Sequence, residues 1–144
     1  MCLPNFYHQY DIVWINNPVT DKEETKRLRG DHYGIVLSED PHNATSGTCI
    51  CCYLTSNLSR LDIKSNIVLQ FYDCLKNPSV AKVATMVQLD NSCINHKVGH
   101  LTDADAERIR DGIKYTFSIN KNIKKKLNTF VANTKLNKNA LITT

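Results

Sequence analysis

The sequence contains no apolar run that approaches the roughly 20 residues needed to span a bilayer. Residues 1–8 contain neither a basic region nor a long apolar core, so they do not look like a secretory signal. These absences predict a cytoplasmic protein with no membrane partner. The chain has 144 residues, of which 42% are apolar, and this size and composition fit one ordinary globular domain.

Acidic residues are missing from the end of the chain. Residues 118–144 carry six lysines and no acid, whereas residues 1–117 carry 12 basic and 14 acidic side chains. All of the net charge of +4 therefore comes from the tail. Such a tail either attracts phosphate or an acidic partner, or it is the solvated face of a helix. We predict a domain over residues 1–117, followed by a lysine-rich helical extension and a frayed tail over residues 118–144.

The six cysteines do not predict a disulfide framework, because the cytosol keeps thiols reduced. Cys49, Cys51 and Cys52 fall in one strand-like run, and strand alternation puts the first two on one face and the third on the other. A metal site there would need two further ligands, for which His42 and Cys74 are candidates. We favour cysteines that pack as small hydrophobes, and we predict no metal and no other cofactor.

The pattern of apolar residues predicts five strands, over residues 10–16, 33–38, 48–54, 65–71 and 81–89. In the last of these, alternation puts Val83, Thr85, Val87 and Leu89 on one face. A long polar loop is expected over residues 17–31 and a turn-rich link over residues 38–47. Short strands at close spacing predict a small β-barrel.

A helix is predicted after the strands. Thr102 is the expected N-cap, with acids in the first turn. Ala106, Ile109, Ile113 and Phe117 recur at helical spacing, so this stripe should pack on the barrel.

Two of the strand-like runs end on small polar residues, which are Ser38 in the run from His32 and Ser56 in the run from Cys49. A basic loop segment, residues 26–29, leads into the first run. This arrangement brings a hydroxyl, an imidazole and guanidinium groups to one edge of the barrel. Those groups suit the binding and cleavage of an RNA phosphodiester.

The order of these pieces over residues 10–117 resembles the PemK/MazF family of toxin-antitoxin toxins. The best-fitting pieces are Gly34–Ser38, Tyr53–Ser56 and Lys97–Thr102. The resemblance implies an α+β fold, an SH3-like small β-barrel of about five to seven strands with a C-terminal helix packed on it. It also implies a homodimer and a sequence-specific, metal-independent endoribonuclease that cuts single-stranded mRNA. A cognate antitoxin protein would inhibit it by laying an acidic or amphipathic segment over the RNA groove.

Thr55 matches the catalytic threonine of the family, but two positions differ from the family pattern. Many members have Arg-Pro where this chain has His32-Tyr33. Asp90 matches an acid that often follows an arginine, and Val87 stands in place of that arginine. Trp14 is expected in the core, with stacking on a base as the alternative, and His96 and His100 are expected to be structural.

Metal-free RNA cleavage needs a base for the 2′-hydroxyl, donors for the charged phosphorane and an acid for the leaving oxygen. Histidine as a residue type can both take up and release a proton near neutral pH, so His32 is a candidate for either proton-transfer role. Thr55 offers a hydroxyl donor, and an arginine offers positive charge. We predict catalytic roles for Thr55, His32 and Arg29, and RNA binding by Lys26, Arg27, Ser56 and Asp90. The rival readings are a CcdB-like toxin that poisons gyrase without cleavage and an SH3-like nucleic-acid-binding module.

Overall fold

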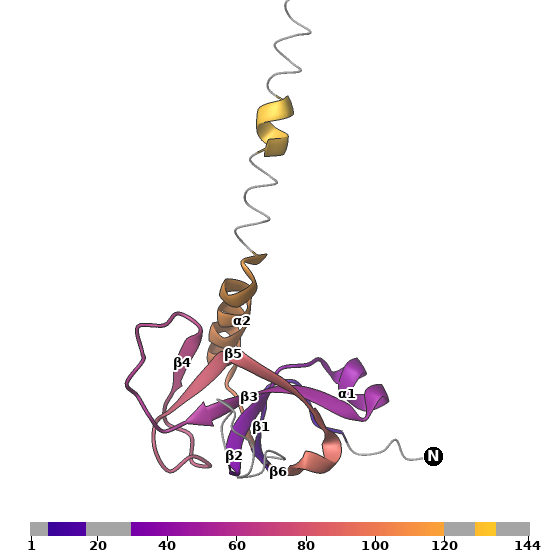
Figure 1. Ribbon diagram of the computed structural model, residues 1–144, viewed down its shortest axis with the longest axis vertical. Helices are drawn as coiled ribbons and strands as arrows, with labels where there is room; N and C mark the ends of the chain where they lie inside the picture. Colours follow the sequence, from indigo (N-terminus) through magenta and orange to yellow (C-terminus); the bar gives the residue numbers. More distant parts are fainter. Residues whose placement is uncertain (1–5, 17–29, 120–128, 135–144) are drawn as a thin grey trace, which may run out of the picture.

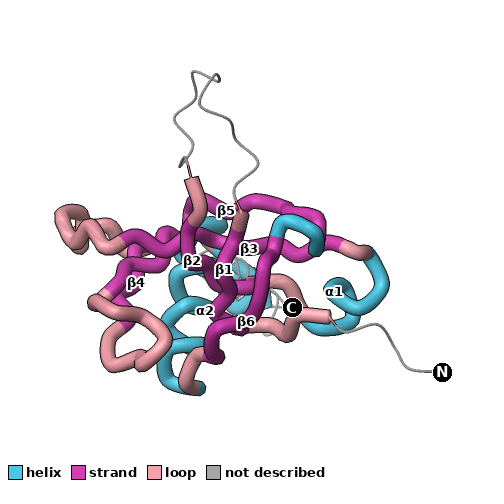
Figure 2. Tube along the Cα trace, turned by 90° about the horizontal axis from the view of Figure 1, so that it is seen from below, coloured by secondary structure: helices cyan, strands magenta, loops and turns pink. Residues whose placement is uncertain are grey.

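The computed structural model describes residues 6–16, 30–119 and 129–134. Six strands form one antiparallel sheet in the order β4-β5-β3-β2-β1-β6, so β4 and β6 are its edges and the sheet is open rather than closed (Figures 1 and 2). The elements are β1 (Asp11–Ile15), β2 (His32–Val36), α1 (Asp40–Ser46), β3 (Thr48–Thr55), β4 (Asn66–Leu69), β5 (Ser79–Asp90), the 3-10 turn η1 (Asn91–Cys93), β6 (Ile94–His100) and α2 (Asp103–Phe117). The strand number and the C-terminal helix confirm the expected fold class.

The sheet is buried on both faces, because its central strands carry apolar residues at odd and even positions. One apolar cluster lies under α2, and the second lies on the opposite face of the sheet. The first includes Ile12, Ile35 and Leu54, and the second includes Val13, Val36 and Tyr53. Figure 1 shows α2 beside β4 and β5. The predicted stripe of α2 is buried at Ala106 and Ile109, whereas Phe117 is 57% exposed.

The cysteines of β3 belong to the core, as predicted. Cys49 and Cys51 lie in one cluster and Cys52 in the other, and all three are completely buried. Burial raises the pKa of the Cys49 thiol to about 11 and that of Cys52 to about 12, so both stay neutral. Within the described segments, no three His, Cys, Asp or Glu side chains are grouped to hold a metal ion.

The link over residues 38–47 is not only a turn, because it contains the short helix α1. Pro41 fits the first turn, where its missing N–H is not needed, and Gly47 ends the helix with a φ of 71°. Asn43 is buried, and its side-chain amide donates to the carbonyls of Tyr7 and Ser38 at 2.9 Å. This helix therefore ties the N-terminal segment to the sheet.

The prediction that one face of β5 runs from Val83 to Leu89 is wrong. Cys52 pairs with Met86 but Leu54 pairs with Ala81, so four residues of β5 lie opposite one residue of β3. This irregularity turns β5 over, and Val83 packs in the cluster under α2 while Leu89 packs in the other.

Strand β6 was not among the predicted strands. It pairs only with β1, and most of its side chains are polar and exposed, so it carries little apolar alternation. Polar residues of this kind are typical of an edge strand.

Helix α2 begins as predicted, with the Thr102 hydroxyl oxygen accepting the Asp105 N–H at 3.2 Å. It ends at Phe117, where Ser118 takes a left-handed conformation with a φ of 56°. Residues 129–134 are helical, and the rest of the predicted lysine-rich extension lies outside the described residues, apart from 118 and 119. No helix in the described parts of the chain is long and apolar enough to cross a membrane.

Candidate functional site

A pocket of about 380 Å³ lies where β2 begins and β3 ends. Gly34 pairs with Tyr53, and the same antiparallel register, continued by two residues, sets His32 opposite Thr55. Ile15 pairs with His32 on one side, and Val80 pairs with Thr55 on the other. The pocket is lined by Trp14, Asp31, His32, Tyr33, Leu54, Thr55, Ser56, Leu75, Lys76, Asn77 and Ser79. The sheet register thus brings the predicted hydroxyl and imidazole together.

Thr55 is the last residue of β3, and its side chain is half-buried. Its Oγ1 accepts the backbone N–H of Asn57 at 3.2 Å. This local bond is common for a threonine at a strand end, and it also fixes the oxygen of the hydroxyl. Because that oxygen acts as the acceptor, the hydroxyl proton is available for donation to an oxygen in the pocket. Ser56 follows on the exposed rim of the same pocket.

His32 is the first residue of β2 and is half-buried. Its ring meets the Tyr53 ring edge-on, with 6.0 Å between centroids and 66° between planes. Tyr53 itself is held in the core, so this contact restricts the orientation of the imidazole. The His32 ring therefore has a restricted orientation in the same pocket as Thr55.

Two aromatic residues form another part of the pocket lining. Trp14 of β1 and Tyr33 of β2 are paired in register, and their rings meet edge-on at 4.7 Å. Both are half-buried rather than enclosed. Trp14 therefore lies at the rim of the pocket, which fits the alternative of base stacking better than a place in the core.

Lys76 and Asn77 are pocket residues that the sequence reasoning missed. They come from the loop between β4 and β5 and reach the site because β5 begins at Ser79, beside the end of β3. Lys76 is the only lysine or arginine among the described residues that line the pocket. The Asn77-Pro78 turn immediately before β5 was the available signal, since the start of a strand that pairs with β3 must lie near Thr55.

Of the other predicted site residues, only Asp90 is described, and it does not line this pocket. Lys26, Arg27 and Arg29 lie outside the described residues. Asp90 pairs with Thr48, at the opposite end of β3 from Thr55. Seven residues of extended strand separate the two ends, which is roughly 23 Å.

A buried carboxylate lies at the opposite end of β1 from the pocket. Asp11 is 1% exposed, and its Oδ1 meets His100 Nδ1 at 2.8 Å and Lys97 Nζ at 3.1 Å. Its Oδ2 accepts the His8 backbone N–H at 2.8 Å. The imidazole of His8 in turn contacts Asp40 at 2.9 Å. These contacts join the N-terminal segment, β1, β6 and α1, and they give His100 the structural place expected of it.

The sequence matches, over residues 8–117, the family described as PemK-like, MazF-like toxin of type II toxin-antitoxin system. It has no match among the curated proteins with which it was compared. Solved structures with a similar fold include MazF from Deinococcus radiodurans, with 16% identity over 79% of this chain and 98% of that one and a TM-score of 0.65. They also include toxin MazF-mt6 from Mycobacterium tuberculosis, with 12% identity over 75% of this chain and 96% of that one and a TM-score of 0.61.

A third structure is an endoribonuclease in complex with its cognate antitoxin from a mycobacterial species. It has 13% identity over 78% of this chain and 95% of that one, with a TM-score of 0.64. At these identities the likeness defines the fold class, an open antiparallel sheet with a C-terminal helix. The family match covers most of the sequence and is more specific. The chain belongs to the PemK-like, MazF-like toxins of type II toxin-antitoxin systems.

Proposed function

We propose that this protein is a metal-independent endoribonuclease that cleaves single-stranded mRNA at a short sequence motif. The observation that carries the proposal is the meeting of Thr55, His32 and Lys76 in one pocket. A hydroxyl donor, a proton carrier and a cation are the three kinds of group that such a reaction needs. Because mRNA is the substrate, the toxin acts in the cytoplasm.

In the proposed reaction, the 2′-oxygen of the substrate attacks phosphorus and the bond from phosphorus to the 5′-oxygen breaks. The products are a 2′,3′-cyclic phosphate and a 5′-hydroxyl. A proton leaves the 2′-hydroxyl and a proton joins the leaving oxygen, and His32 carries one of these two transfers. Requirement for the 2′-hydroxyl makes the reaction specific for RNA.

Charge builds up on the phosphate oxygens in the transition state. Thr55 donates a hydrogen bond to one of them, and Lys76 supplies the positive charge. Ser56 on the rim offers a second hydroxyl. Arg29, Arg27 and Lys26 remain proposed RNA contacts, and no part of the reaction above depends on them. Asp90 of β5 pairs with Thr48, which is 7 residues along β3 from Thr55. Its proposed role is therefore only RNA binding away from the cleaved bond.

The proposal is tested by inducing the protein in bacteria and measuring RNA and DNA lengths. Wild type should arrest growth and shorten mRNA while chromosomal DNA stays intact, and Thr55→Ala should do neither. Thr45→Ala is a matched control, because Thr45 is an exposed threonine of α1 and bonds only the Pro41 carbonyl among the described contacts. Broken DNA with intact RNA would instead indicate gyrase poisoning, and growth without either change would indicate a binding module.

We also propose that the toxin forms a homodimer and is inhibited by a cognate antitoxin. Family membership supports both, and the Deinococcus radiodurans relative is known in a MazE-MazF structure. Light scattering of the purified toxin should give twice the mass of one chain. Co-expression with a small acidic protein encoded next to this one should restore growth and yield a stable complex. A toxin that is monomeric and that no protein encoded beside it binds would contradict this part.

A further inference from the structure

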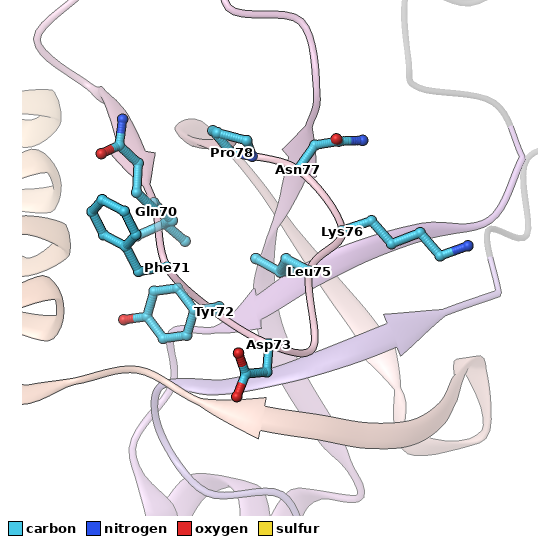
Figure 3. A pocket seen from close by; sticks show the side chains of 9 residues that line it. Gln70, Phe71, Tyr72, Asp73, Leu75, Lys76, Asn77 and Pro78 are labelled. Atoms are coloured by element: carbon cyan, nitrogen blue, oxygen red, sulfur yellow. The ribbon is translucent and has the colours of Figure 1, made fainter.

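The pocket with Thr55 is connected to two further hollows through shared residues. The neighbouring hollow, of about 460 Å³, shares Leu75, Lys76 and Asn77 with it (Figure 3). A third hollow, of about 310 Å³, shares Gln70 and Phe71 with the second. Each hollow has the size of a small-molecule site. Through these shared residues the three hollows follow one another from the candidate active pocket to Asp105 and Arg108 on α2, and we call this series the track.

Phe71 stands where the second and third hollows meet, and its side chain is 99% exposed. Its backbone has a φ of 67°, a left-handed conformation that a bulky residue seldom adopts. The residues around it hold that conformation. Leu69 is buried at the end of β4, and the Tyr72 hydroxyl donates to Asp105 Oδ2 at 2.6 Å and accepts the Thr102 N–H at 3.0 Å. A wholly exposed ring on a backbone that is held in a strained conformation points to a contact with a ligand.

The track carries both cations and carboxylates. Lys76 lies at the first junction and Arg108 in the third hollow, and each of the three hollows also has one aspartate in its lining. One Arg108 nitrogen donates to the Val68 carbonyl at 2.7 Å and to Asp105 Oδ1 at 2.9 Å, and the other N–H groups of the guanidinium can still donate to a phosphate. Gln70 and Asn77 are exposed amides in the middle hollow, and amides can hydrogen-bond the edge of an unstacked base.

We infer that this track binds the single-stranded RNA that flanks the cleaved bond, with Phe71 as a stacking platform for one base. This inference rests on the proposed function, because it takes the Thr55 pocket as the place of cleavage. Stacking on one aromatic ring changes affinity by about five- to 150-fold when the ring is removed. Phe71 therefore sets affinity for RNA that extends beyond the first pocket.

Binding is measured with fluorescently labelled 2′-O-methyl RNA, which cannot be cleaved because its nucleophile is blocked. The full chain should bind a mixed-sequence 12-mer about five- to 150-fold more weakly after Phe71→Gly. Binding of a trinucleotide, which fills only the first pocket, should not change. Phe71→Gly is chosen because glycine adopts a positive φ without strain, so the variant should be at least as stable as wild type.

Two further variants complete the test. Phe71→Trp should bind the 12-mer as tightly as wild type, since it keeps an aromatic face. Phe117→Ala removes another exposed phenylalanine, on α2 and outside the track, and should have no effect. Equal 12-mer binding by wild type and Phe71→Gly would overturn the inference while leaving cleavage untouched. The same result with loss of the dimer would make Phe71 a protein contact instead.

The two proposals can fail separately. If the protein binds the 12-mer through Phe71 but never cuts unmodified RNA, the RNA-binding track is supported and the endoribonuclease proposal is refuted. If Phe71→Gly cuts RNA with wild-type efficiency, the endoribonuclease proposal is supported and the track is refuted. Absence of any 12-mer binding at low salt would reject the track, and the cutting assay alone would then decide the endoribonuclease.

Discussion

Replacing Asp11 by alanine should be among the most destabilising single changes in the described part of the chain. The carboxylate is 1% exposed and holds three donors, at 2.8 Å from the His8 N–H, 2.8 Å from His100 and 3.1 Å from Lys97. In Asp11→Ala these donors lose their shared acceptor. The N-terminal segment then loses one of its two carboxylate anchors, the other being Asp40.

The magnitude follows from how buried each partner is. A part-buried backbone N–H left without an acceptor costs about 1–3 kcal/mol. His100 and Lys97 are about half exposed, so water replaces much of what each ion pair loses, and each costs about 0.2–1 kcal/mol. The free energy of unfolding should therefore fall by about 1.4–5 kcal/mol, which corresponds to a fall in Tm of about 5–20 °C.

The assay is urea unfolding of wild type, Asp11→Ala and Asp62→Ala. Asp62 pairs with Arg60 at 3.3 Å, but both side chains are at least 66% exposed, so its loss should leave the unfolding midpoint unchanged. If Asp11→Ala unfolds within about 0.5 kcal/mol of wild type, the reasoning from burial and shared donors is refuted.

Three further outcomes are expected. Gly34→Ala should lower the free energy of unfolding by about 1–3 kcal/mol, because the added Cβ would lie 2.9 Å from the Cys52 carbonyl oxygen; thermal unfolding checks this, and an unchanged Tm refutes it. A hydrogen bond from His8 and then one from the Gln9 N–H lower the pKa of Asp40 below its ordinary value of 3.8, so its contribution is present above that value and is lost as pH falls through the folded pKa. Wild type should therefore lose stability below about pH 4 more steeply than Asp40→Asn, and parallel acid titrations would contradict this. Alkylation of the native protein at pH 8, mapped by mass spectrometry, should leave the three fully buried thiols of β3 unlabelled until denaturant is added (Cys49, Cys51 and Cys52). Rapid labelling of any of them would disprove its place in the core.

The elements that the sequence predicts well are those with strong local signals. Strands β1, β2 and β3 are short runs that are dense in apolar residues, and Thr102 marks the start of α2 by its own side chain. Strand β6 was not predicted because an edge strand buries few side chains and so shows little apolar pattern. Helix α1 was not predicted because Asn43, which anchors it, finds one of its two partners, the Tyr7 carbonyl, in a distant segment.

The candidate site divides in the same way. Thr55 and His32 were predicted from residue type, position and family resemblance, and only the register of β2 on β3 places them side by side. Lys76 was missed because its place in the pocket depends on how β5 pairs with β3 across the sheet. The change of face along β5, between Val83 and Leu89, also follows from that pairing. The pairing itself cannot be read from the local sequence of β5.

The central claim is that the Thr55 pocket cuts RNA without a metal. Its most direct test is incubation of the purified protein with a long single-stranded RNA in EDTA, with fragments and their ends read on a gel. Wild type and Thr45→Ala should give the same discrete fragments with 2′,3′-cyclic phosphate ends, and Thr55→Ala should cut at least about 100-fold more slowly. Intact RNA with wild type, or undiminished cutting by Thr55→Ala, would contradict the account.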